Sequence, residues 1–382
     1  MELYKSMHNE FKIDDLIRVA KRENNTKRRY LYVNPMQGKH IPVSPSLSLE
    51  LFGAMARDLE KKYAGERVFV IGFAETATAI GSAVACGAEN VRYYMNTTRE
   101  DIPGARYLFF TESHSHATEQ RLVTNGLAEI ISRADRIVFA EDEVTTGNTI
   151  VKLIDVLKEN YDCGSCGFGI TSILNSMSDH RLEQLQSEGI GCSFIKRIPP
   201  GYMTDIIDNY TYKPLDKVIR FEEEYKCREI CLRCGWNCRV VNSTQFIRET
   251  ADRAVESFLS QMKFPGRVDS VLVLGTEEFM FPAMYTGMKI EQRFPDAYVR
   301  FHATTRSPIE TSGASDYPLH ERRPLLSLYD DKRNTFIYNI ARYDCVILMT
   351  DARPVQANGL SSLLRAVIDA GNTDITLVRW EA

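Results

Sequence analysis

The chain has 382 residues, of which 44% are apolar and 26% are charged, and this composition excludes a wholly disordered protein. Its 47 Lys and Arg against 51 Asp and Glu give a net charge of −4, which excludes a strongly basic nucleic-acid binder at the level of the whole chain. No uncharged apolar run reaches the ~18 residues that span a bilayer, and the first residues lack the apolar core of a secretory signal. We therefore expect a cytoplasmic protein of two or three domains, whose 9 Cys are reduced thiols or metal ligands.

The predicted elements begin with a helix over residues 13–20, where apolar side chains recur at helical spacing. A short strand follows at 30–33, and a second helix runs from Ser46 to about Tyr63. From residue 67, apolar runs typical of strands buried on both faces alternate with helical patterns. The strands are expected at 67–73, 91–95, 106–110, 136–140, 168–174 and 192–195, and the helices at 75–87, 122–131, 148–161 and from about 178. This alternation predicts an α/β fold with a doubly wound, mainly parallel sheet.

Residues 203–245 interrupt this rhythm with a charged, Tyr-rich stretch that contains a Cys cluster. We therefore predict one domain over 1–202, a Cys-rich linker over 203–245 and a second α/β domain over 246–382. Three ordered matches relate the two halves: RVFVIGFAET with SVLVLGTEEF, VRYYMNTTRED with VRFHATTRSPI, and RADRIVFAED with RYDCVILMTD. We infer two copies of one unit, the second degenerate. The alternative is that two unrelated α/β domains share a strand–turn–helix rhythm.

The strand predicted at 136–140 delivers two acids, Glu141 and Asp142, at its carboxyl end. In open α/β sheets ligands bind at such ends, and the start of the following helix is an anion site. Two carboxylates beside this site suit a sugar phosphate, because they accept hydrogen bonds from ribose hydroxyls while the loop holds the phosphate. The predicted substrate-binding residues of the loop are Glu143, Val144, Thr145, Thr146, Gly147, Asn148 and Thr149. The alternative is a plain strand–loop–helix with a capping Thr.

This stretch resembles the phosphoribosyl-diphosphate signature of type I phosphoribosyltransferases. Together with GKHIPV, GFAETAT, ESHSHATEQ and a late TRSP, it makes the chain similar to the phosphoribosyltransferase-like family encoded with tellurium-resistance gene clusters. In that family a phosphoribosyltransferase domain precedes a TRSP domain, which is named for a motif found here at Thr305 to Pro308.

The resemblance implies an enzyme that uses phosphoribosyl diphosphate and Mg²⁺ to form or cleave an N-glycosidic bond to a base-like acceptor. It also implies a role in making a nucleoside-like molecule. The expected partners are these small molecules and a second copy of the chain in a homo-oligomer, a dimer, with no membrane or nucleic acid. The alternative function is a non-catalytic sensor of a nucleotide or of phosphoribosyl diphosphate on the same fold.

The resemblance assigns further residues to the site. The turn after the first buried strand would contact the diphosphate through Ala74, Glu75, Thr76, Ala77 and Thr78. Glu75 is an acid where an anion binds, so it would instead reach Mg²⁺ or the acceptor, or form a helix-capping pair with Thr76. Arg99, at the end of a strand, either neutralises the diphosphate or forms a surface ion pair.

Two other polar segments carry candidate residues. His114 and His116 lie where such enzymes have a mobile hood, and they would transfer a proton as catalytic residues beside Glu141 and Asp142. The alternatives for them are a Glu/His metal site or solvated loop residues. In the early Gly- and Pro-rich loop, Lys39 and His40 would lie over the diphosphate or the acceptor, or on a charged surface turn.

A cysteine cluster and the second copy complete the set of candidates. The four residues Cys227, Cys231, Cys234 and Cys238 supply enough thiolates for a structural zinc site. Their spacing also places them on one stripe of a helix, so the alternatives are a packing stripe or, for the first three, an iron–sulfur cluster. In the second copy, Arg306, Ser307 and Arg353 are predicted to bind an anion or a product; the alternative is a partner-binding relic.

Overall fold

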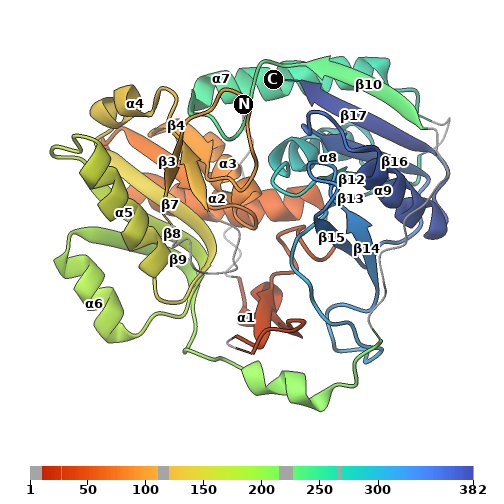
Figure 1. The fold of residues 1–382 in the computed structure, drawn as a ribbon, viewed down its shortest axis with the longest axis horizontal. Helices are drawn as coiled ribbons and strands as arrows, with labels where there is room; N and C mark the ends of the chain where they lie inside the picture. The colour runs from red at the N-terminus through yellow and green to blue at the C-terminus, as the bar shows by residue number, and fades with distance from the viewer. Residues whose placement is uncertain (1–10, 27, 111–119, 215–226, 265–267, 382) are drawn as a thin grey trace. The chain divides into compact units, whose positions relative to one another are not determined.

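A computed structural model describes residues 11–26, 28–110, 120–214, 227–264 and 268–381 (Figure 1). The described chain divides into two compact units. Unit 1 comprises Leu49–Tyr202 and Trp236–Thr250, and unit 2 comprises Glu10–Ser48, Met203–Gly235 and Ala251–Ala382. This division differs from the predicted one, because the segment before Leu49 joins the second unit and the predicted linker is shared between both units. None of the helices in the described ranges is long and apolar enough to cross a membrane.

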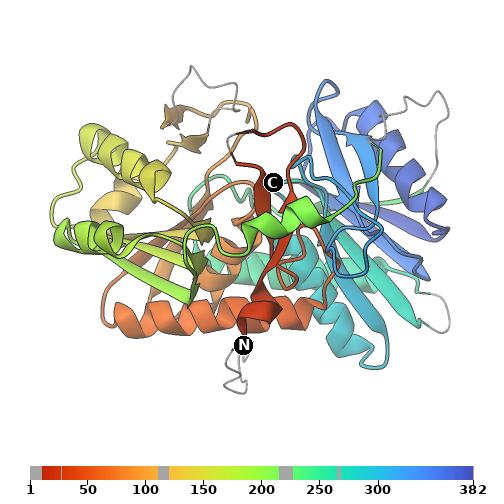
Figure 2. The same cartoon turned by 90° about the horizontal axis from the view of Figure 1, so that it is seen from below.

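Unit 1 is built on a six-stranded sheet. Its strands are β3 (Val68–Gly72), β4 (Val91–Asn96), β7 (Arg136–Val144), β8 (Gly167–Asn175), β9 (Ile190–Arg197) and β11 (Asn242–Ser243). Their order is β11-β4-β3-β7-β8-β9, and all neighbours are parallel except β11 and β4. Since β3 is apolar and buried along its whole length, it needs cover on both faces. Figure 2 shows helices on both faces of this sheet.

The helices of unit 1 are the larger part of α2 (Pro45–Lys62), α3 (Thr78–Gly87), α4 (Leu127–Arg133), α5 (Asn148–Asn160) and α6 (Asp179–Ser187). A small antiparallel hairpin, β5 (Tyr107–Phe109) with β6 (Arg121–Val123), lies between β4 and β7 in the chain. The predicted fold class, an α/β unit with a mainly parallel sheet, is therefore confirmed.

Unit 2 is built on a five-stranded sheet in which all neighbours are parallel. Its strands are β10 (Arg228–Arg233), β12 (Ser270–Gly275), β13 (Tyr298–Ala303), β16 (Cys345–Thr350) and β17 (Ile375–Glu381), in the order β10-β17-β16-β12-β13. Its helices are α1 (Ile13–Leu16), the larger part of α7 (Thr244–Gln261), α8 (Phe281–Arg293), α9 (Ala357–Asp369) and a 3-10 turn, η1 (Thr204–Asn209). Two antiparallel hairpins belong to it as well, β1 (Arg18–Lys21) with β2 (Tyr30–Val33), and β14 (Arg322–Leu326) with β15 (Asn334–Tyr338).

The two sheets have the same plan. The order β4-β3-β7-β8 in unit 1 corresponds to β13-β12-β16-β17 in unit 2, and each sheet adds a further strand beyond it, β9, which follows β8 in the chain, and β10, which precedes β12. A hairpin precedes the third strand of each plan, and α5 and α9 follow that strand in the two units. The three sequence matches fall on the pairs β3/β12, β4/β13 and β7/β16, which is the arrangement that a repeat would give, and the repeat itself stays an inference. In both units the chain changes direction across the sheet beside the first strand, which is where open α/β sheets bind ligands.

Two predicted helices, and the helix considered as an alternative for the cysteine cluster, differ from the structure. Ala20 lies in β1, paired with Leu31, because residues 18–21 form a hairpin with β2. Residues 121–123 form β6, so the helix that follows begins only at Leu127. The Cys-rich stretch forms β10, where burial alternates between exposed Cys231 and its buried neighbours.

Candidate active site

The candidate site of unit 1 lies at the carboxyl ends of β3, β4 and β7. These three strands are adjacent and parallel, so the residues that follow them meet at one edge of the sheet. A side-chain hydrogen bond crosses this edge, from Thr76 Oγ1 after β3 to Asp142 Oδ1 on β7, at 3.0 Å. Thr76 therefore orients Asp142. It does not form the predicted capping pair, because the N-cap of α3 is Ala77 and no side chain caps it.

The acid pair has unusual electrostatics. Glu141 and Asp142 lie near the end of β7, and both are partly buried. Burial raises the pKa of Glu141 well above its usual value, and the adjacent charge of Asp142 raises this pKa further. The positive charge of Arg99 acts in the opposite direction and lowers the pKa of Glu141. Arg99 thus lies close enough to the acid pair to interact with it, as a residue of the site would.

The loop after β7 leads directly into α5. Gly147 is the N-cap of α5 and has a φ of +71°, a left-handed conformation that favours glycine. Thr146, Asn148 and Thr149 are exposed, whereas Gly147 is buried. The first four N–H groups of a helix have no intrahelical acceptor, so this exposed first turn can bind an anion.

A residue that the sequence did not single out supports this loop. Arg181 of α6 donates from Nε to the Thr146 carbonyl at 2.9 Å and from an Nη to Asn148 Oδ1 at 3.3 Å. Arg181 lies in a polar helix more than 30 residues after this loop, so no sequence motif links the two.

The turn after β3 is held by Thr97, the first residue after β4. The Thr97 N–H donates to the Gly72 carbonyl at 2.9 Å, and the Ala74 N–H donates to Thr97 Oγ1 at 2.9 Å. Glu75, in this turn, has 6% of its surface exposed. The turn 74–78 therefore lies at the same edge as the acid pair, and Glu75 is a buried acid within it. Contact of this turn with a diphosphate stays a prediction.

Two family models match this chain. A model described as a phosphoribosyl transferase matches residues 16–195, and a model of the TRSP domain, described as C-terminal to it, matches residues 233–367. The chain is a phosphoribosyltransferase-like protein with a TRSP domain. The domain arrangement that the sequence motifs implied is thus confirmed.

Solved structures that are similar to this chain include three adenine phosphoribosyltransferases. Those of Rhodothermus marinus, Giardia lamblia and Saccharomyces cerevisiae are 14%, 12% and 8% identical, with TM-scores of 0.34, 0.33 and 0.32. The three matches extend over 49%, 48% and 47% of this chain. They extend over 96%, 94% and 94% of the respective solved chains. At these TM-scores the similarity carries no argument about activity. No curated protein matches the chain.

Four other predicted site residues come from two further segments of the chain. Lys39 and His40 belong to unit 2, where Lys39 Nζ donates to the carbonyls of Glu277 and Thr304 at 2.8 and 2.9 Å. The Lys39 side chain is thus bonded within unit 2, and a role for Lys39 and His40 over the diphosphate or the acceptor stays a prediction. His114 and His116 lie outside the described residues.

The TRSP motif forms a buried polar cluster in unit 2. Arg306 Nε is 2.8 Å from Glu277 Oε2, and an Arg306 Nη is 3.7 Å from Glu278 Oε1. Arg353, predicted with Arg306 to bind an anion or a product, is exposed, and its positive charge contributes to lowering the pKa of Glu381, at the end of β17. The N–H of Ser307 donates to Thr305 Oγ1 at 3.2 Å, which places Ser307 in a turn.

The four clustered cysteines do not share one environment. Three of them lie in unit 2, whereas Cys238 lies in unit 1, where its carbonyl accepts from the Asn96 N–H at 2.8 Å. Cys231 is exposed, and Cys234 and Cys238 are buried. Within the described ranges, no group of three or more His, Cys, Asp or Glu side chains is placed to hold a metal ion. Zinc binding stays a prediction.

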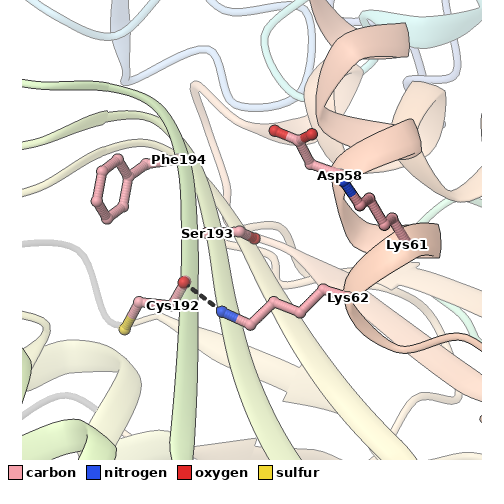
Figure 3. A pocket seen from close by; sticks show the side chains of 6 residues that line it. All are labelled: Asp58, Lys61, Lys62, Cys192, Ser193 and Phe194. Carbon is pink, nitrogen blue, oxygen red and sulfur yellow. Dashed lines mark hydrogen bonds between the residues drawn. The ribbon is translucent and has the colours of Figure 1, made fainter.

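A surface pocket of about 460 Å³ lies away from the sheet edge (Figure 3). It is lined by Asp58, Lys61 and Lys62 of α2 and by Cys192, Ser193 and Phe194 of β9. The Lys62 Nζ donates to the Cys192 carbonyl, and burial lowers the pKa of Lys62. Because Cys192 lies opposite Ile170, in the middle of β8, this pocket is separate from the candidate active site.

Proposed function

We propose that unit 1 transfers a phosphoribosyl group from phosphoribosyl diphosphate to a base-like acceptor. The observation that carries this proposal is the position of Glu141 and Asp142 directly before the left-handed Gly147 turn and the start of α5. One sheet edge thereby offers acceptors for ribose hydroxyls and donors for a phosphate, at a separation set by one short loop.

In this proposal each group has a definite task. The carboxylates of Glu141 and Asp142 accept hydrogen bonds from the ribose hydroxyls. The backbone N–H groups and threonine hydroxyls of residues 145–149 hold the 5′-phosphate. Arg99, whose charge already acts on Glu141, would neutralise the diphosphate as it leaves.

The donor set of this edge fits Mg²⁺. Glu141, Asp142 and Glu143 offer carboxylate oxygens, the ligand type that Mg²⁺ prefers, and Mg²⁺ usually takes its remaining ligands from water and substrate phosphates. Bound there, the ion would neutralise negative charge on the diphosphate.

The chemistry then follows from charge. Displacement of diphosphate at the anomeric carbon creates positive charge on the ribose and negative charge on the leaving group. The carboxylates of Glu141 and Asp142 stabilise the former, and Arg99 stabilises the latter. The acceptor is a base-like nitrogen compound, and its product would be a nucleoside-like molecule of the kind that the resemblance to tellurium-resistance clusters suggests.

Calorimetry with phosphoribosyl diphosphate and Mg²⁺ tests donor binding. We expect Asp142→Asn and Gly147→Ala each to weaken binding at least about tenfold. Asp142→Asn removes a charge-assisted contact, and Gly147→Ala puts a side chain on the left-handed residue that shapes the phosphate loop. Asp155→Asn, an exposed acid on α5, is the matched control and should bind like wild type. Full binding by both site variants would refute the assignment.

A panel of nitrogenous bases then tests transfer. Base-dependent release of diphosphate would establish a transferase and identify its acceptor class. Donor binding without release, across purines, pyrimidines and simpler bases, would contradict transfer and favour a sensor of phosphoribosyl diphosphate.

A further inference from the structure

The TRSP motif of unit 2 lies at the same place in its sheet as the candidate active site does in unit 1. The Thr304 N–H donates to the Gly275 carbonyl at 3.0 Å, and the Glu277 N–H donates to Thr304 Oγ1 at 3.0 Å. These two bonds repeat, position for position, the bonds of Thr97 with Gly72 and Ala74. The edge geometry of the first copy is therefore preserved in the second.

The residues at this second edge form what we name the TRSP cluster: Glu277, Glu278, Arg306, Tyr329, Arg333 and Asp351. Three of them take the repeat positions of site residues in unit 1: Glu278 corresponds to Glu75, Arg306 to Arg99, and Asp351 to Asp142. The hydroxyl of Tyr329 donates to Asp351 Oδ1 at 2.6 Å. Asp351 thus keeps both its position and a hydroxyl donor that orients it.

Two arginines converge on one carboxylate in the TRSP cluster. Glu277 Oε2 lies 2.8 Å from Arg306 Nε and 3.4 Å from Arg333 Nε. The Glu277 side chain is 1% exposed, and those of Arg306 and Arg333 are 9% and 17% exposed. Arg333 lies on the loop between β14 and β15, so two separate loops bring these guanidinium groups together.

Glu277 has a backbone conformation that is uncommon for its residue type. Its φ is +48°, and its carbonyl accepts from the buried Lys39 Nζ at 2.8 Å. A non-glycine residue held in the left-handed region costs of order 1–3 kcal/mol and persists only when its surroundings fix it. Such positions cluster at ligand sites, and here the strained residue places a carboxylate on two arginines.

We propose that the TRSP cluster is a second binding site, for a small phosphorylated molecule that carries hydroxyl groups, a sugar phosphate or a nucleotide. The phosphate replaces the Glu277 carboxylate on Arg306 and Arg333, whose planar donors match phosphate oxygens. Asp351 accepts from the hydroxyl groups, as Asp142 would in unit 1. This site is independent of the function proposed for unit 1.

The phosphate lies on the arginine side because the other side has lost its anion loop. The residue before α9 is Gln356, with an extended backbone at φ −71°, where unit 1 has the left-handed Gly147. Pro354, which has no N–H, stands where unit 1 has Thr145. In unit 1 the phosphate thus binds at the loop before α5, whereas in unit 2 it binds beside Arg306 and Arg333.

The test uses the full chain in four forms: wild type, Gly147→Ala, Arg306→Gln and the double variant. Ribose 5-phosphate is titrated into each by calorimetry, with AMP and inorganic phosphate as further probes. We expect two sites in wild type, binding at least about tenfold weaker at one of them in each single variant, and at both of them in the double variant. If unit 1 binds no sugar phosphate, Gly147→Ala has no effect and Arg306→Gln alone weakens binding, so failure of the proposed function is distinguishable.

Two further variants keep the test decisive. Arg333→Gln removes a more exposed guanidinium and should weaken binding at unit 2 at least about tenfold. Arg365→Gln, which breaks an exposed pair with Asp369 on α9, should leave binding unchanged. Binding that is equal in wild type, Arg306→Gln and Arg333→Gln overturns the proposal, as does binding of inorganic phosphate as tight as that of ribose 5-phosphate and AMP.

Hydrogen exchange tests the same site without altering Arg306 or Arg333. In the Gly147→Ala chain, ribose 5-phosphate should slow amide exchange around Glu277 and in the loop 327–333. Unchanged exchange in both segments at saturating ligand overturns the proposal.

Discussion

At the scale of single residues, Glu141 is an acid whose surroundings disfavour its charged form. Its pKa is raised by burial and by Asp142, so the folded chain favours its protonated form more than the unfolded chain does. The contribution of Glu141 to stability is therefore fully present below its usual pKa of 4.5 and is lost as the pH rises through the raised pKa.

Glu141→Gln should remove this dependence. We expect the variant to be more stable than wild type at neutral pH, with the difference shrinking to nothing below the usual glutamate pKa, because both proteins then carry a neutral group. Urea unfolding over a pH series measures this directly. Glu159→Gln, at an exposed position on α5, is the control and should show no such trend. A pH-independent difference for Glu141→Gln would mean that Glu141 is not a desolvated acid.

The same residue makes donor binding depend on pH. An ionised carboxylate is the better acceptor for ribose hydroxyls, so binding of phosphoribosyl diphosphate should tighten as the pH rises through the raised pKa of Glu141. Calorimetry at several pH values should show a shallower pH dependence in Glu141→Gln than in wild type. Identical pH profiles in the two proteins would place the titrating group elsewhere.

At the scale of elements, one threonine closes the ligand edge of each sheet. Thr97 accepts from the Ala74 N–H, and Thr304 accepts from the Glu277 N–H, and both threonines are fully buried. Thr97→Val and Thr304→Val should each cost about 1–3 kcal/mol, because each leaves one buried N–H without an acceptor. Chemical denaturation measures the loss, and Thr97→Ser and Thr304→Ser, which keep the hydroxyl, are the matched controls. Valine variants as stable as the serine ones would show that these bonds do not support the turns.

The elements also show which features the sequence could reveal. Strands such as Val68–Gly72 were predictable because they are buried on both faces, and the acid pair and its loop were predictable because they are adjacent in the chain. The contacts of Lys39, Arg181 and Arg333 were not predictable, since each bonds to residues that are distant in sequence. The β10 strand was missed because the spacing of its cysteines also fits a helix, although the alternation of Ile230 and Leu232 indicates a strand.

At the scale of the whole molecule, each compact unit is assembled from segments that are not consecutive in the chain. The segment before Leu49 is part of unit 2, where the Val43 N–H and carbonyl bond to Phe301 and the Gly38 carbonyl lies 3.1 Å from His302 Nδ1. Ala20, Leu31 and Val33 pack in a core with Phe336 and Tyr338. A division of the chain at residue 203, as the sequence suggests, would separate this segment from its unit.

A fragment of residues 1–202 should therefore contain a segment that cannot fold. We expect backbone amides in β1 and β2 to be protected from hydrogen exchange in the full chain but to exchange at unfolded rates in the fragment, because their packing partners are missing. Amides of β3 and β7 serve as the internal control, since the neighbours of both strands lie within the fragment. Adding the complementary piece, residues 203–382, should restore protection in β1 and β2. Protection of β1 and β2 in the isolated fragment would show that the N-terminal segment folds without unit 2.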